Sequence, residues 1–180
     1  MVPFLWDRRR GYRAGVRTSV DVHNFLIERD APHEVVPTRG RLRSADRIAS
    51  ALDLPPDQVG KVVIFEGRAG PIAAVVPAGH EPDPSLVAKA LGRGRVRPAT
   101  EDRASELTGY LAESIPPAGL PNGFAVVIDT SLDRDEVLYF IGGESRSVLK
   151  IRGKDLARAT KARVAPILSA PPTGRSSRHP

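Results

Sequence analysis

The sequence predicts a single α/β domain of the α+β type, in which helices flank a mixed, largely antiparallel sheet. Its 180 residues are enough for one domain with a sizeable core. Apolar stripes at helical spacing alternate with short apolar strands. The central elements run hairpin, helix, strand, helix rather than as repeated βαβ units. Short connections between the strands favour antiparallel neighbours.

The N-terminal third is expected to form two helices separated by a short strand. Residues 18–29 make the first helix, because Thr18-Ser19 can cap it and its apolar side chains follow at helical spacing. A strand over 34–37 comes next. The second helix begins after Ser44, carries apolar side chains at positions i, i+3, i+4 and i+7, and ends before Pro55-Pro56.

The centre of the chain predicts a β-hairpin and then a capped helix. Strands over 61–66 and 71–77 are joined by a Gly-Arg-Ala-Gly turn. Asp83 caps the helix that follows, and Gly92 closes it. The next elements are a strand over 94–97 and a short helix over 100–107.

The last third predicts three strands and one helix, over residues 124–129, 136–141, 147–151 and about 154–162. Residues 169–180 are rich in Pro, Ser and Arg and have no apolar periodicity, so we expect a disordered tail. Residues 1–17 form a basic extension. The predicted domain therefore spans residues 18–168.

The residue types exclude several kinds of chemistry. The chain has no cysteine, which excludes disulfides, thiolate metal sites and cysteine nucleophiles. Its four histidines are not paired at metal-ligand spacing, so neither a metal nor another cofactor is expected. No apolar run approaches a membrane span, and the N-terminal apolar stretch is too short for a signal peptide. We therefore expect a cytoplasmic protein with no membrane partner.

The net charge of +6 resides at the two ends of the chain. Residues 1–17 carry five Arg and one Asp, and residues 169–180 carry two Arg, so the body is formally neutral. Two local groups remain basic, Arg93-Arg95-Arg97 and the cations between Arg146 and Arg163, and either could contact phosphates or form a solvated face. DNA binding through the N-terminus has only charge to support it, because no helix-turn-helix or zinc pattern occurs.

Lys61 opens an apolar run that extends to Phe65. Burying an unpaired ammonium group costs several kcal/mol. The lysine therefore either lines a cleft or packs its stem at the strand edge with its charge in water. Three glycine- and proline-containing segments follow downstream, at Gly109-Tyr110, Pro116–Gly119 and Gly142-Gly143.

Taken in order, these segments resemble the YbaK family of aminoacyl-tRNA deacylases, which is related to the editing domain inserted in bacterial prolyl-tRNA synthetases. The segments that carry the resemblance are SADRIASALDLPPDQVGKVVIFE, VAKALGRGRVRPATEDRASELTGYLAESIPPAGL, VVIDTSL and FIGGESRSVLKIRGKDL. The resemblance implies a barrel-like sheet. It also implies hydrolysis of the ester between a wrongly chosen amino acid and the 3′-terminal adenosine of a tRNA. An aminoacyl-tRNA is then the expected partner, with an aminoacyl-tRNA synthetase as a second candidate.

The resemblance also places the functional residues. Ester hydrolysis needs a positioned water and donors aimed at the developing oxyanion. The family lysine falls on Lys61, which we assign to the terminal adenosine or its phosphate, and backbone groups at Gly119, Gly142 and Gly143 are expected to hold the carbonyl and the water. The residues expected to bind substrate are Val62, Ser114, Ile115, Pro116, Pro117, Ala118, Ile141 and Glu144. The simpler alternatives are a surface turn for the first loop and a plain hairpin bend for Gly142-Gly143.

The chain departs from the family where specificity is set. Val62 replaces a usual threonine, Glu113-Ser114 replaces a frequent Gly-Gly, and Glu144 stands where the branch acting on cysteinyl-tRNA tends to have basic residues. The motifs therefore do not identify the amino acid that is removed. They also leave a second function open, a binding module that has lost catalysis and holds tRNA ends, a synthetase or a small ligand. Asp129, at the end of an apolar strand, has two open interpretations, a functional carboxylate or a cap of the following turn.

Overall fold

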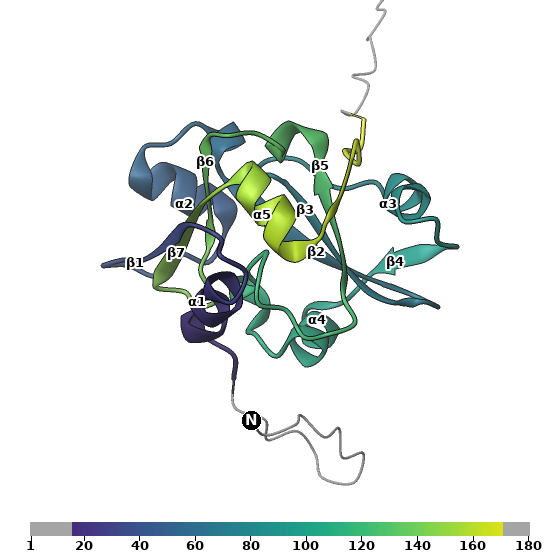
Figure 1. Cartoon of the computed structure of the whole chain (residues 1–180), viewed down its shortest axis with the longest axis horizontal. Coiled ribbons are helices and arrows are strands. Elements are labelled where there is room, and N and C mark those ends of the chain that lie inside the picture. Colours follow the sequence, from purple (N-terminus) through teal and green to yellow (C-terminus); the bar gives the residue numbers. More distant parts are fainter. Residues whose placement is uncertain (1–15, 171–180) are drawn as a thin grey trace, which may run out of the picture.

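The computed structural model describes residues 16–170, and within them five α-helices surround eight strands in two sheets (Figure 1). Most of the predicted tail and most of the predicted basic extension, residues 171–180 and 1–15, lie outside the described residues. The first residue of the predicted tail is ordered, since the amide of Ser169 donates to the carbonyl of Glu81. No helix within 16–170 is long and apolar enough to span a bilayer.

The smaller sheet is antiparallel throughout. Its strand order is β1 (His33–Pro37), β7 (Ser147–Arg152) and β6 (Val137–Ile141). Leu149 of the central strand β7 pairs with Val35 of β1 on one side and with Phe140 of β6 on the other. This sheet supports the turn that carries Gly142-Gly143, because that turn connects β6 to β7.

The larger sheet is mixed. Its strand order is β4 (Val96–Pro98), β2 (Gly60–Gly67), β3 (Gly70–Pro77), β5 (Ala125–Asp129) and β8 (Arg163–Ala165). The predicted hairpin, β2 and β3, is antiparallel over its whole length, and β4 pairs antiparallel with the far end of β2. In contrast, β3, β5 and β8 run parallel to one another.

The two sheets do not close into a barrel, so the barrel-like part of the fold prediction is wrong. Within the described residues they are joined by a single parallel bridge between Val59 and Tyr139. Beside it the ring of Phe140 packs directly against the backbone of Gly60, where a Cβ would lie 2.0 Å from the ring. Beyond this point the two strands continue into different sheets. The α+β class and the largely antiparallel pairing are confirmed.

The helices begin at, or within one residue of, the predicted positions. They are α1 (Ser19–Ile27), α2 (Ala45–Leu52), α3 (Pro84–Ala90), α4 (Glu101–Thr108) and α5 (Gly153–Thr160). Thr18 and Asp21 form a capping box at α1, and Ser44, Asp83 and Thr100 cap the next three. Each cap satisfies backbone amides that a helix leaves without intrahelical partners.

The core consists of three apolar clusters. The main cluster contains Leu26 of α1, Ile64 of β2 and Leu156 of α5, while α3 covers a second cluster and α2 a third. Side chains alternate across β2, so Ile64 faces the main cluster whereas Phe65 faces the second. Two parts of the predicted site, Lys61 and Gly142-Gly143, follow the bridge that joins the start of β2 to β6.

Candidate functional site

Lys61 lies neither in bulk solvent nor unpaired in the interior. Its side chain keeps 27% of its surface exposed and forms an ion pair with Glu81. Glu81 is held in place through its backbone, whose carbonyl accepts a hydrogen bond from the amide of Ser169 at 2.8 Å. The partner explains how a cation can begin an otherwise apolar strand.

The position of Lys61 is set by the contact between β2 and β6. The bridge from Val59 to Tyr139 lies two residues before Lys61 on one strand and two before Ile141 on the other. Lys61 shares the pleated face of Val59, whose cluster includes Ile141. Val62 points the other way, into the main cluster with Ile115 and Ala118. The first residues of β2 thus alternate between the cluster that contains Ile141 and the cluster that contains the residues of the Ser114–Gly119 loop.

The loop from Ser114 to Gly119 is buried at every residue, which rules out the surface-turn interpretation. Gly119 has a φ of +76°, and a Cβ there would lie 3.0 Å from both the hydroxyl of Tyr110 and the Cα of Val22. Its carbonyl accepts hydrogen bonds from the Tyr110 hydroxyl at 2.9 Å and from Arg17 at 3.1 Å. Burial raises the pKa of Tyr110, so the phenol remains a neutral donor.

The segment that begins at Gly142 is both a hairpin turn and a buried contact. The Gly142 amide donates to the carbonyl of Ser147 at 2.9 Å, as in a turn between β6 and β7. Gly143 has a φ of +96°, and a Cβ there would lie 3.0 Å from the backbone carbonyl of Thr18. Gly142-Gly143 therefore does form a hairpin bend, as the simpler alternative predicted. The bend also packs against the residues that begin α1.

Both bends converge on the first turn of α1. Gly143 lies against Thr18, Gly119 lies against Val22, and the hydroxyl of Ser19 donates to the Glu144 carboxylate at 3.3 Å. This convergence could not be read from the sequence, because the three segments are separated by many residues. The structure therefore brings together two of the three predicted parts through α1, a helix that was predicted but not assigned to the site.

A second connection crosses between the same two bends. The amide of Leu42 donates to the carbonyl of Ser145, and the next residue, Arg43, forms an ion pair with Glu113 at 3.6 Å. Glu113 is one of the positions where the sequence predicts a departure from the family pattern. Leu42, Arg43 and Glu81 are absent from the predicted site, and their spacing in the chain gave no signal for them.

The loops differ in which backbone donors they can offer. Pro116 and Pro117 have no amide hydrogen, and the amides of Gly142 and Ser114 already donate to the carbonyls of Ser147 and Leu111. Within residues 16–170, hydrogen-bond acceptors are not found for four remaining amides, those of Ile115, Ala118, Gly119 and Gly143. These are the backbone groups that could bind a substrate oxygen.

Ser114 has a buried hydroxyl for which residues 16–170 supply no hydrogen-bond partner. Leaving such a group unsatisfied costs about 1–3 kcal/mol. Behind the same loop is a cavity of ≈ 160 Å³, lined by Pro117–Phe124 together with residues of α1 and α5.

The other candidates have structural roles. Asp129 accepts hydrogen bonds from Ser131 and from the amide of Ile167, so it caps the turn as the simpler interpretation predicted. His23 and His33 contact each other at 2.9 Å, and no group of three or more metal-ligating side chains occurs within residues 16–170.

Comparison with known proteins assigns the family. The model of the aminoacyl-tRNA editing domain matches residues 40–159. The chain belongs to the aminoacyl-tRNA editing domain family. This confirms the resemblance inferred from the motifs.

Among curated relatives, this editing domain is 24% identical over 120 residues to a proline–tRNA ligase of Streptococcus thermophilus, covering 67% of the chain and 19% of the ligase. It thus spans about a fifth of the length of that relative. It is 22% identical over 125 residues to "Putative Cys-tRNA(Pro)/Cys-tRNA(Cys) deacylase EbsC" of Enterococcus faecalis, covering 69% of the chain and 76% of that protein.

A solved structure described as "a putative trans-editing enzyme for prolyl tRNA synthetase" has the same fold as this editing domain. The TM-score is 0.74 at 25% identity, with 84% of the chain and 97% of that structure covered.

Proposed function

We propose that this editing domain is an aminoacyl-tRNA deacylase, which hydrolyses the ester between a mischarged amino acid and the 3′-terminal adenosine of a tRNA. The observation that carries the proposal is the convergence of two buried glycine bends on α1, one of which follows the strand β6 that is bridged to Val59, two residues before Lys61. The family assignment and the relatives named for deacylation support it. As a protein that acts on charged tRNA, it would work in the cytoplasm.

The reaction needs only backbone amides and one cation. Water attacks the ester carbonyl, the bond from the carbonyl carbon to the ribose oxygen breaks, and that oxygen takes a proton as the amino acid leaves. Amides of Gly119 and Gly143 would stabilise the oxyanion, where fixed donors contribute most. A ribose hydroxyl of the substrate assists in positioning the water.

Lys61 would bind a phosphate of the terminal adenosine in place of its present ion-pair partner, Glu81. The side chain of Glu81 is 68% exposed, so solvent screens the ion pair and a substrate phosphate can displace the carboxylate. The lysine then contributes charge without the cost of an unpaired ammonium group in the resting protein.

The test is a panel of mischarged tRNAs, assayed for release of labelled amino acid by wild-type protein and by Lys61→Ala. We expect turnover of at least one tRNA, and a loss of about ten- to a hundredfold in kcat/KM in the variant, as for removal of a hydrogen bond between charged groups worth about 1.5–3 kcal/mol. Lys150→Ala is a matched control, because Lys150 is 30% exposed and pairs with a Glu34 that is 66% exposed. Full activity in Lys61→Ala would refute the role of the lysine.

One observation favours the second candidate, a binding module. The ion pair between Arg43 and Glu113 places a charged side chain where relatives frequently have glycine. If the wild-type protein binds tRNA ends but releases no amino acid across the panel, the binding module replaces the deacylase. A synthetase partner is a further proposal, supported by the match to part of a proline–tRNA ligase.

A further inference from the structure

The tip of the β2–β3 hairpin and the neighbouring β4 form a basic hollow. It has a volume of ≈ 350 Å³ and is lined by Glu66, Gly67, Arg68, Arg95, Val96 and Arg97. The three arginines are exposed, with 80% of the Arg97 side chain open to solvent. This hollow was predicted only as an arginine cluster, and it has no part in the site described above.

Local packing directs the arginines outward. Val96 is buried in the cluster beneath α3, so the neighbouring residues on either side point to the opposite face. Gly67 pairs with Val96, and its missing Cβ allows the valine side chain to pack within 3.1 Å of the Cβ position. Arg93 fixes the hairpin tip by donating to the carbonyl of Gly70 at 3.0 Å. The hollow is therefore built on rigid elements.

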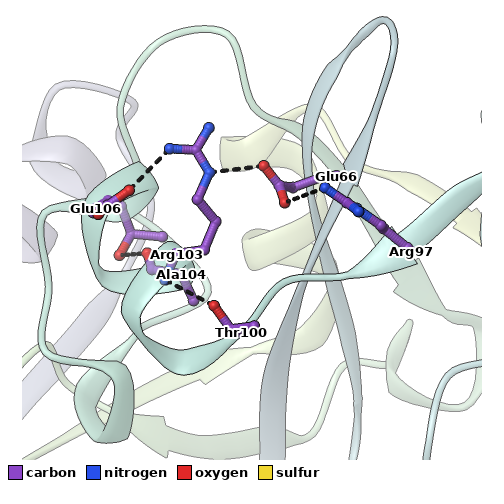
Figure 2. Close-up of polar contacts among 7 residues, drawn as sticks. Glu66, Arg97, Thr100, Arg103, Ala104 and Glu106 are labelled. Atoms are coloured by element: carbon purple, nitrogen blue, oxygen red, sulfur yellow. Dashed lines mark hydrogen bonds and ion pairs between the residues drawn. The ribbon is translucent and has the colours of Figure 1, made fainter.

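The one carboxylate of the hollow is already neutralised. Glu66 accepts a hydrogen bond from Arg103 of α4 at 2.8 Å and lies 3.7 Å from Arg97 (Figure 2). The hydrogen bonds of Arg103 to Glu66 and then to Glu106 raise the pKa of that guanidinium, which keeps it charged. Arg68 and Arg95 have no ion-pair partner within residues 16–170. The hollow thus presents an excess of positive charge.

We propose that this hollow binds the phosphate backbone of the duplex part of a tRNA whose 3′ end lies at Lys61. The proposal rests on the proposed deacylase function. Lys61 and Gly67 lie six residues apart on β2, which at about 3.3 Å per residue separates them by about 20 Å. An unpaired tRNA end can cover that distance before the duplex begins. Lys61 alternates onto the face of Phe65 and Val96. Arg95 and Arg97 point to the other face, so the bound tRNA would pass around the edge strand β4. Guanidinium groups bind phosphates through paired donors.

The competing explanation is edge protection. β4 is an edge strand of the larger sheet, and charged side chains on such strands prevent pairing with other chains. That role predicts association of the protein with itself when the arginines are removed, and no change in affinity for tRNA.

The test measures binding of uncharged total tRNA to Arg68→Ala/Arg95→Ala over a range of salt concentrations. The slope of log K against log salt is negative, and each lost phosphate contact reduces its magnitude by slightly less than one. We therefore expect the magnitude of the slope to decrease by about two in the double variant. Affinity at moderate salt should decrease about tenfold. The matched control is Arg39→Ala/Arg47→Ala, which removes the same charge from two exposed residues that lie outside both predicted basic groups.

An equal loss in the control would overturn the proposal in favour of diffuse attraction between charges. Unchanged tRNA binding with increased self-association would overturn it in favour of edge protection.

Turnover separates this proposal from the deacylase proposal. With a charged full-length tRNA, Arg68→Ala/Arg95→Ala should raise KM and leave kcat unchanged. With a charged oligonucleotide that contains only the unpaired 3′ end, neither constant should change. If the wild-type protein hydrolyses neither substrate, the deacylase proposal fails while the salt titration still decides whether the hollow binds tRNA.

Discussion

Replacing Gly119 by alanine tests whether the first bend is packed against α1 as tightly as the structure indicates. The position has a φ of +76°, which costs a residue with a Cβ about 1–2 kcal/mol. The new Cβ would also lie 3.0 Å from the Cα of Val22 and 3.1 Å from the carbonyl of Asp21, both backbone atoms that cannot rotate away. Overpacking of this kind adds about 1–3 kcal/mol. We therefore expect Gly119→Ala to lower the free energy of unfolding by about 3 kcal/mol.

Gly79→Ala is the matched control, because Gly79 has a φ of +78° and no atom within 4 Å of its Cβ position. It should show the backbone cost alone, about 1–2 kcal/mol. Urea denaturation of both variants gives the difference, which should be about 2 kcal/mol, or about 4–8 °C in thermal midpoint. Equal losses in the two variants would refute the close contact between the bend and α1.

Two further predictions concern single polar side chains. Ser114→Ala should leave stability unchanged or raise it by about 1 kcal/mol, because it removes a buried hydroxyl that lacks a partner, whereas Ser147→Ala should lose about 1 kcal/mol with its hydrogen bond. Urea denaturation distinguishes them, and a matching loss in Ser114→Ala would mean that its hydroxyl is bonded. Hydrogen bonds from the Ser85 hydroxyl and then from the amides of Leu86 and Ser85 hold the pKa of Asp83 below 3.8. The stability that this carboxylate contributes is therefore present above that pH and is lost as the pH falls through the lower, folded-state pKa. Thermal denaturation should show wild-type protein losing more stability than Asp83→Asn on acidification, and the opposite order would contradict the cap.

The elements governed by local chemistry could be predicted from the sequence, whereas strand partners could not. Caps such as Ser44 and Asp83 act within one helical turn, so the residue types suffice. The pairing of β5 with β3 depends on contacts between distant segments, and β8 is too short for a periodic signal. The sequence therefore did not reveal which strands of the mixed sheet run parallel, β3 with β5 and β5 with β8, nor that the sheet stays open.

The same distinction applies to the candidate site. Gly119 and Gly143 were named from the resemblance to the family, and both adopt the positive φ that favours glycine. The partners of Lys61 and Glu113 could not be identified, because ion pairs between separate segments leave no pattern in one sequence.

Each end of the described chain is fastened to a part of the candidate site. The amide of Arg17 donates to the carbonyl of Gly109, its side chain reaches Gly119, and Ser169 is bonded to Glu81. Trimming the protein back to residue 18 or to residue 168 would therefore release a glycine bend or the carboxylate that neutralises the lysine. Affinity tags and domain fusions should accordingly be separated from these anchors by flexible spacers, since a force on either anchor acts directly on residues of the candidate site.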